Sequence, residues 1–216
     1  MANLTGASGG SDIDALAKYL LDMKPNNMND EMTACKINRA MLAGPSHITK
    51  DATIVDMNMD GSQTILRKGT NRWVCMPGNE NMIGEAPMCA NIHGLVWASS
   101  AAKGLPEPLN EQPGIIYMLC GASQHSNTDA LDKTSPAIPI GPHWMICWPY
   151  TKGVPERNFN TERIGIPNTV RDAGAWQMFD NTPYSYTHIC GDPWAGNVYD
   201  PRKNKPVWTM QYQASN

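Results

Sequence analysis

The spacing of apolar residues changes along the chain, from a helical period near the N-terminus to a strand period farther on. Residues 11–24, SDIDALAKYLLDMK, predict an amphipathic helix that begins at a cap on Ser11 or Asp12, with an apolar stripe at helical spacing. Residues 29–45, NDEMTACKINRAMLAGP, predict a second helix that ends at a Gly-Pro pair. The chain therefore opens with two helices.

The remainder of the chain has the pattern of strands, with one further helix. Residues 52–69 predict a hairpin that turns at Asp60-Gly61, and residues 113–122, PGIIYMLCGA, predict a central strand because they are apolar and bounded by turn residues. Residues 86–104 have helical spacing and predict a third helix. Later strands are expected at 138–150, at 175–194 with a break at Asn181-Thr182-Pro183, and at 205–213.

These elements predict an α+β fold, in which N-terminal helices are followed by a mostly antiparallel β-sheet with one inserted helix. The pattern divides the chain into a flexible N-terminus, residues 1–11, and a single globular domain, residues 12–216. Within that domain the part 12–44 is helical and the part 50–216 is rich in strands. The 17 prolines and 18 glycines among 216 residues agree with short elements joined by many turns.

The charge pattern excludes two classes of partner. The formal net charge is −3 and the basic residues are scattered singly, so the chain has no basic stripe for nucleic acid. No apolar run approaches the roughly 20 residues that a membrane helix needs, which predicts a soluble protein. The start, MANLTGASGGS, lacks a signal region, and it fits either a cytoplasmic N-terminus or one that follows a removed signal.

Two histidines lie in predicted strands beside groups that can carry out chemistry. Strand alternation places His143 on one face with Met145 and Cys147. The later strand has two phenols, an imidazole and a thiol on one face, namely Tyr184, Tyr186, His188 and Cys190. Neighbouring strands can bring the two imidazoles within a few ångströms of each other. Such a pair suits acid–base catalysis, with a tyrosine or the second histidine as the acid, or the binding of a divalent metal ion with a carboxylate.

A polar loop, GASQHSNTDALD, follows the predicted central strand and adds further candidates. Asp129 can orient a histidine or ligate a metal ion, Asn127 can donate a hydrogen bond to a carbonyl oxygen, and His125 is a third candidate metal ligand. The alternative is a turn whose side chains hydrogen-bond their own backbone, and it is at least as good an explanation of Asp132. For each histidine, the alternative is a hydrogen-bonded structural role.

Other chemistries have weaker signals. The chain has no G-x-S-x-G elbow, P-loop, dinucleotide fingerprint or H-E-x-x-H motif. A Cys–His nucleophile at Cys147 or Cys190 would need a depressed thiol pKa. Cys75 and Cys89 flank a polar loop and either form a disulfide or remain buried thiols. The tryptophans either fill the core or offer a stacking surface to an aromatic or sugar ligand.

Five motifs follow one another between about residues 50 and 190: RKGTNRWVCMPGN, APMC, GIIYMLCGASQHSNTDA, GPHWMI and DNTPYSYTHI. In this order they resemble a family of small, mostly uncharacterised secreted bacterial proteins. The sequence departs from the family pattern at Ala130, where proline is usual, and by one extra residue before His188, which affects the register of that histidine. The resemblance implies a secreted or periplasmic protein and favours the Cys75–Cys89 disulfide. It also implies a shared set of site residues: Asn127, Asp129, His143, Tyr184 and His188.

The sequence leads to one main hypothesis and two alternatives. The main hypothesis is a small-molecule enzyme, a lyase, isomerase or hydrolase, that acts on an apolar or aromatic substrate through His143 and His188, as an acid–base pair or as ligands of one divalent metal ion. Four side chains would orient or assist them: Asn127, Asp129, Tyr184 and Tyr186. The first alternative is a non-catalytic protein that binds a small ligand in the same pocket. The second is a secreted structural or interaction protein.

Overall fold

The computed structural model describes residues 31–58, 62–79, 81–126, 132, 134–153, 160 and 174–191. Its helices are α2 (Glu31–Leu42), α3 (Ser46–Thr49) and α4 (Ile92–Ala102). Its strands are β1 (Thr53–Met57), β2 (Gln63–Arg67), β3 (Trp73–Met76), β4 (Met88–Asn91), β5 (Gly114–Met118), β6 (Ala122–Gln124), β7 (Ile138–Ile140), β8 (His143–Cys147), β9 (Ala175–Met178) and β10 (Tyr186–Cys190). Four predicted features lie outside the described residues: the flexible start at 1–11, the helix at 11–24, the Asp60-Gly61 turn and the strand at 205–213.

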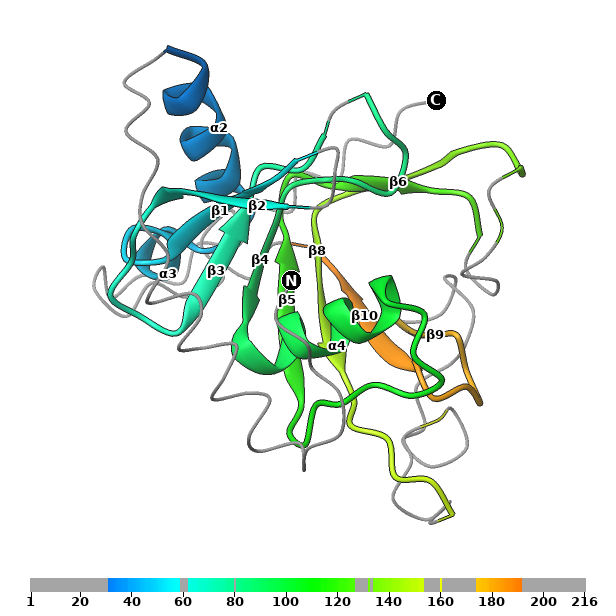
Figure 1. The fold of residues 1–216 in the computed structure, drawn as a ribbon. Helices are drawn as coiled ribbons and strands as arrows, with labels where there is room; N and C mark the ends of the chain where they lie inside the picture. Colours follow the sequence, from blue (N-terminus) through cyan, green and yellow to red (C-terminus); the bar gives the residue numbers. More distant parts are fainter. Residues whose placement is uncertain are drawn as a thin grey trace, which may run out of the picture.

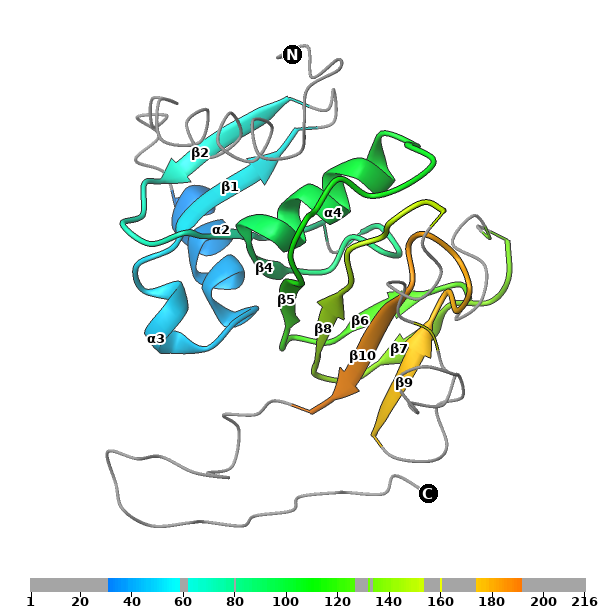
Figure 2. The same ribbon diagram turned by 90° about the horizontal axis from the view of Figure 1, so that it is seen from below.

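One large sheet forms the centre of the fold. Eight strands lie in the order β2-β1-β3-β4-β5-β8-β10-β9 (Figure 1). Strand β6 pairs with β7 in a separate two-stranded sheet (Figure 2). Every pair in the large sheet is antiparallel except β1 with β3, which is parallel. The predicted α+β class, with a mostly antiparallel sheet and an inserted helix, is therefore confirmed, and β5 is a central strand as predicted.

Helices cover the two faces of this sheet. Helices α4 and α2 lie on opposite faces (Figure 2). Trp97 of α4 packs on the face that carries Ala90 and Ile116, whereas Ala40 of α2 packs on the opposite face, which carries Cys89. The face under α4 continues across β8, β10 and β9, where it buries a second set of side chains: Met145, Cys147, Tyr186, Trp176 and Met178. The larger part of the apolar core therefore lies between α4 and the half of the sheet that contains β5, β8, β10 and β9.

Two glycines allow α4 to lie directly on β5. A Cβ atom added at Gly114 would lie 2.5 Å from both the Cα and the N of Gly94, and one added at Gly94 would lie 2.8 Å from the carbonyl oxygen of Ile115. The Asn91 side chain fixes the start of the helix, because its Oδ1 accepts hydrogen bonds from Gly94 N at 2.8 Å and from Ile115 N at 3.0 Å. Helix and strand are thus joined by contact and by a shared cap.

Two predicted elements have different bounds in the structure. The helix predicted at 86–104 begins only at Ile92, because residues 88–91 form β4, whose residues pair with β3 on one side and β5 on the other. The strand predicted at 138–150 is divided at Gly141-Pro142 into β7 and β8, which belong to different sheets. A proline lacks the N–H that a continuous ladder would use, which explains the break.

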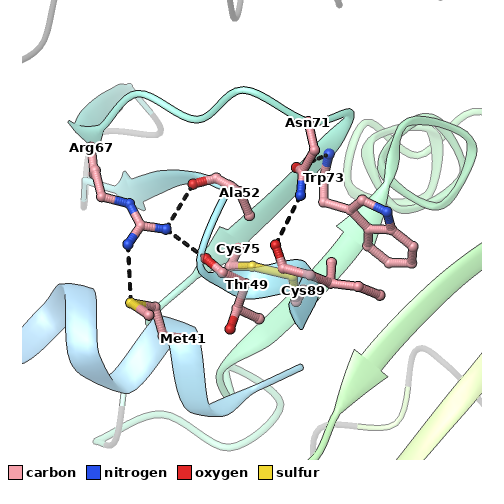
Figure 3. Close-up of a disulfide and its surroundings, with 9 residues drawn as sticks. Met41, Thr49, Ala52, Arg67, Asn71, Trp73, Cys75 and Cys89 are labelled. Carbon is pink, nitrogen blue, oxygen red and sulfur yellow. Dashed lines mark hydrogen bonds between the residues drawn. A yellow bond between two sulfur atoms is a disulfide. The ribbon is translucent and has the colours of Figure 1, made fainter. Parts of the chain in front are cut away.

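The disulfide joins Cys75 and Cys89, which lie opposite each other on the antiparallel strands β3 and β4 (Figure 3). Both cysteines are fully buried under α2. Nearby, Arg67 donates hydrogen bonds to the carbonyl oxygens of Thr49 at 2.6 Å and Ala52 at 2.9 Å, which anchors the end of α3 to β2 (Figure 3). The predicted Cys75–Cys89 disulfide is confirmed, and a disulfide of this kind persists in oxidising compartments.

Among the described residues, no helix is long and apolar enough to cross a membrane.

Candidate functional site

The candidate site lies where β8, β10 and β9 run side by side. In the register of these strands His188 lies opposite Met145 of β8 on one side and opposite Trp176 of β9 on the other, while His143 lies opposite Cys190. Along β8, buried and half-buried residues alternate, so the predicted alternation of faces is confirmed. His143 and His188 consequently occupy diagonal positions on the same face of the sheet.

Three aromatic rings from these three strands form a continuous stack. The ring centroids of His143 and His188 lie 4.1 Å apart with their planes 20° apart, and those of His188 and Trp176 lie 3.8 Å apart with their planes 27° apart. The exposed fraction of each residue is at most 2%. The predicted proximity of the two imidazoles is confirmed, and Trp176 encloses His188 from the side opposite His143.

The hydrogen bond of His143 determines which of its nitrogens carries the proton. Its Nδ1 lies 2.8 Å from the carbonyl oxygen of Gly141. Because a carbonyl oxygen can only accept, Nδ1 must be the protonated nitrogen. In the neutral imidazole, Nε2 therefore has the free lone pair and is the nitrogen that can act as a base.

His188 is a buried imidazole whose two ring nitrogens are both without a hydrogen-bond partner among the described residues. It is 1% exposed. Leaving a buried polar group unsatisfied costs about 1–3 kcal/mol, and buried polar groups of native proteins are nearly always paired. Trp97, on α4 above the same face, also has a buried ring nitrogen without a partner in this part of the chain. The face beneath α4 thus has hydrogen-bonding capacity that the described chain does not use.

Burial keeps both imidazoles neutral at neutral pH. The pKa of His188 is lowered to about 3, chiefly by burial and further by the neighbouring His143. The pKa of His143 is also lowered by burial, an effect that the hydrogen bond to Gly141 partly opposes. A neutral imidazole has both a donor and an acceptor nitrogen, so each ring can give or receive a proton without first losing one to solvent.

The thiol and phenol side chains predicted on this face differ in where they lie and in the contacts they make. Tyr186 and Cys147 lie opposite each other on β10 and β8, and burial raises the pKa of both groups. The thiol of Cys147 therefore stays protonated, which disfavours it as a nucleophile. Burial also raises the pKa of the exposed Cys190 thiol. Tyr184 precedes β10 rather than lying on it, and its hydroxyl donates to the carbonyl oxygen of Leu105 at 2.9 Å.

Among the candidates from the polar loop, His125 and Asp132 make contacts of their own, and the other two lie outside the described residues. His125 follows β6 of the two-stranded sheet, and its Nδ1 contacts the carbonyl oxygen of Ser135. Asn127 and Asp129 lie outside the described residues. Asp132 accepts hydrogen bonds from the backbone N–H groups of Thr134 at 2.9 Å and Ser135 at 3.0 Å, so the turn explanation of this residue is confirmed.

The stacked arrangement disfavours one metal ion held by both imidazoles. A metal ion lies about 2 Å from a ligating nitrogen, along the lone pair in the plane of the ring. The lone pairs of two rings that face each other at 4.1 Å lie in two separate, nearly parallel planes, so one ion does not lie in both planes. In addition, no group of three or more His, Cys, Asp or Glu side chains in the described part of the chain is placed to hold a metal ion.

Sequence reasoning placed Trp176 among the tryptophans that fill the core or offer a stacking surface, but it did not place this residue beside the histidines. The predicted break at residues 181–183 contained the necessary signal. In a hairpin centred on Thr182, residues at equal distance on either side face each other, and Trp176 and His188 are each six positions away.

Comparison of the chain with protein-family models, with curated proteins and with solved structures found no match.

Proposed function

We propose that this protein binds an apolar or aromatic small molecule at the His143–His188–Trp176 stack and transforms it by acid–base chemistry. The observation that supports this proposal is His188, which is 1% exposed and has no partner for either ring nitrogen in the described structure. A ligand with one donor and one acceptor would satisfy both nitrogens of the neutral ring. Apolar and aromatic neighbours around a few polar groups are typical of small-molecule sites.

The roles of the two imidazoles follow from their protonation. His143 Nε2 accepts a proton from the substrate, while Nδ1–H remains bonded to the Gly141 carbonyl and keeps the ring oriented. Because burial lowers the pKa of this imidazole, the imidazolium that forms is acidic and readily returns its proton to the product. Neutral His188 binds and orients the substrate. Returning the proton to another atom of the substrate completes an isomerase reaction, and returning it to a group whose bond to the substrate breaks as a double bond forms completes a lyase reaction. Neither reaction needs a nucleophile.

We propose that a ligand reaches the stack from the start of β8. Gly141 and Pro142 are exposed, and His143 follows them directly. Cys190, which pairs with His143, is exposed as well. His143 is thus next in sequence to an exposed residue, and a displacement of these end residues would admit a ligand.

We also propose that the protein is secreted or periplasmic, which the Cys75–Cys89 disulfide supports.

A thermal-shift screen of apolar and aromatic compounds tests the proposal. We expect compounds that raise the melting temperature of the wild type by several degrees but have no effect on His188→Phe, which retains a ring in the stack and removes both nitrogens. His47→Gln is the matched control, because His47 is an exposed histidine on α3. A screen without any histidine-dependent compound would contradict the proposal.

A second measurement separates catalysis from binding. Each compound that passes the screen is incubated with wild type and with His143→Gln, and its conversion is followed by mass spectrometry. We expect turnover by the wild type only, with binding retained in His143→Gln. If the wild type binds the compound without converting it, the catalytic part of the proposal is wrong and the protein is a ligand-binding protein.

A further inference from the structure

Four hydrogen-bonded side chains lie on the face of the sheet opposite the stack, and we call them the polar network. Thr187 Oγ1 accepts a hydrogen bond from Trp148 Nε1 at 2.8 Å and donates one to Gln177 Oε1 at 2.8 Å. Gln177 Nε2 in turn donates to Ser185 Oγ. Three of the four residues are almost fully buried, with exposed fractions of 2% for Gln177, 1% for Thr187 and 5% for Ser185. The network thus places several polar groups inside the protein and gives them partners.

The polar network joins the same three strands as the stack. Thr187 directly precedes His188 on β10, and Gln177 directly follows Trp176 on β9. Trp148 comes directly after the end of β8. Successive residues of a strand point to opposite faces of a sheet, so the Thr187–Gln177 hydrogen bond lies behind the contact between the two rings. A displacement of β9 that breaks this hydrogen bond would therefore also separate the rings.

Strand β9 needs such a restraint because it is the last strand of the described sheet, where it pairs with β10. An edge strand is held by backbone hydrogen bonds on one side. A shift of its register by two residues would leave every side chain on its own face, but Trp176 could then lie opposite Tyr186 instead of His188. The Thr187–Gln177 hydrogen bond joins residues that lie opposite each other, so it favours the present register.

We propose that Thr187 is a positioning residue of the candidate site. Through its hydrogen bond with Gln177 it holds β9 in the register that stacks Trp176 on His188. Apolar side chains in these two strands would also be buried, but apolar contacts have no preferred direction, whereas a hydrogen bond does. A buried network whose groups all have partners therefore specifies one arrangement. The consequence for ligand binding rests on the function proposed above, whereas the consequence for the stack does not.

Two substitutions of Thr187 separate positioning from simple packing. Thr187→Ser keeps the hydroxyl group and loses the methyl group, whereas Thr187→Val keeps the shape and loses the hydroxyl group. Proton NMR reports the stack, because the ring protons of a histidine stacked on an indole are shifted upfield, and the His188 signals are those absent from His188→Phe. We expect Thr187→Ser to keep the upfield shift and Thr187→Val to lose most of it. A residue that only filled the core would give the reverse order, since valine packs well in strands.

Compounds that pass the thermal-shift screen provide the second readout. They should raise the melting temperature of Thr187→Ser as they do that of the wild type, and they should have little effect on Thr187→Val. If the NMR signals follow the expectation but no compound binds the wild type, the proposed function is contradicted and the positioning role of Thr187 stands.

Gln177→Met removes the same hydrogen bond from the other strand and should also reduce the upfield shift of His188. Thr53→Val is the matched control, because Thr53 is a buried threonine of β1, 7% exposed, whose Oγ1 accepts a hydrogen bond from Gly69 N at 3.1 Å. It should leave the His188 signals in place. Circular dichroism checks that each variant is folded. The proposal would be overturned if Thr187→Val and Gln177→Met kept the upfield shift, if Thr187→Ser or Thr53→Val lost it as fully as Thr187→Val, or if Thr187→Val and Gln177→Met both failed to fold, which would make the role of the hydrogen bond purely structural.

Discussion

His188 combines two properties that conflict in a purely structural residue, since it is fully buried and its ring nitrogens are unpaired in the described chain. His188→Phe keeps an aromatic ring against His143 and Trp176 and removes the unpaired nitrogens, which relieves a penalty of about 1–3 kcal/mol per group. We therefore expect this variant to melt at or above the wild-type temperature while it loses the ligand. Differential scanning calorimetry measures the first effect.

Trp176→Ala contrasts with His188→Phe, because it removes one side of the stack and leaves a cavity. It should lose about 3–5 kcal/mol of stability. If His188→Phe instead melted well below the wild type, the imidazole would be making interactions that support the fold, and the structural alternative for this histidine would be favoured.

Much of the site could be predicted residue by residue, because strand alternation is a property of local sequence. The alternation along residues 143–147 follows from it, whereas the proximity of His143 to His188 also requires that β8 and β10 pair. The stacking of the rings and the unpaired nitrogens of His188 could not be predicted, since they depend on side-chain rotamers and on what packs against them. The position of Tyr184 depended on where β10 begins, and that is set by its pairing with β8 and β9.

The contact between α4 and β5 determines how the helix covers the site. Gly114→Ala would place a Cβ atom 2.5 Å from backbone atoms of Gly94, so that the helix must move away from the strand. We expect a loss of about 1–3 kcal/mol, the range that overpacking of a core costs, or more, because the obstacle is backbone. The measurement is urea unfolding followed by tryptophan fluorescence.

Gly141→Ala is the control for this substitution. A Cβ atom there would meet nothing within 4 Å, the backbone is not in the left-handed region, and the carbonyl that holds His143 is retained. Its stability should stay within about 0.5 kcal/mol of the wild type. Equal losses in both variants would show that the Gly94–Gly114 approach is not what limits the position of α4.

The two errors in the predicted elements have different physical origins, one in tertiary pairing and one in the local sequence. Residues 88–91 have the apolar spacing of a helix, but they pair on both sides within the sheet, and this pairing outweighs the local preference. The division between β7 and β8 had a local signal in Pro142. Helix α2 was predicted correctly because its helical pattern is long, and strands β1 and β2 because an Asp-Gly turn signal lies between two strand patterns.

At the scale of the whole molecule, the α+β class could be predicted from the sequence of elements, whereas the order of strands could not. The parallel pairing of β1 with β3 and the insertion of β5 between β4 and β8 join segments that are distant in the sequence. No local pattern encodes such neighbours. The same topology brings β8, β10 and β9 together, so the stack of His143, His188 and Trp176 is a product of the complete sheet.

The pH dependence of stability follows from burying two imidazoles in their neutral form. Unfolded histidine titrates near its ordinary pKa of about 6.5, whereas the pKa of His188 in the folded protein is about 3 and that of His143 is also lowered. Below about pH 6.5 the unfolded chain therefore binds more protons than the folded protein, and stability falls as the pH decreases. Each extra proton costs about 1.4 kcal/mol per pH unit until the folded pKa is reached.

Urea unfolding at pH 7, 5.5 and 4.5 measures this effect. The wild type should lose stability steadily between pH 5.5 and pH 4.5, and His188→Phe should lose about 1.4 kcal/mol less over that unit because one of the two buried imidazoles is gone. His47→Gln, a substitution at an exposed histidine, is the control. If His188→Phe and the wild type had the same slope, His188 would be protonated in the folded protein at these pH values, and its assignment as a neutral ligand-binding imidazole would fail.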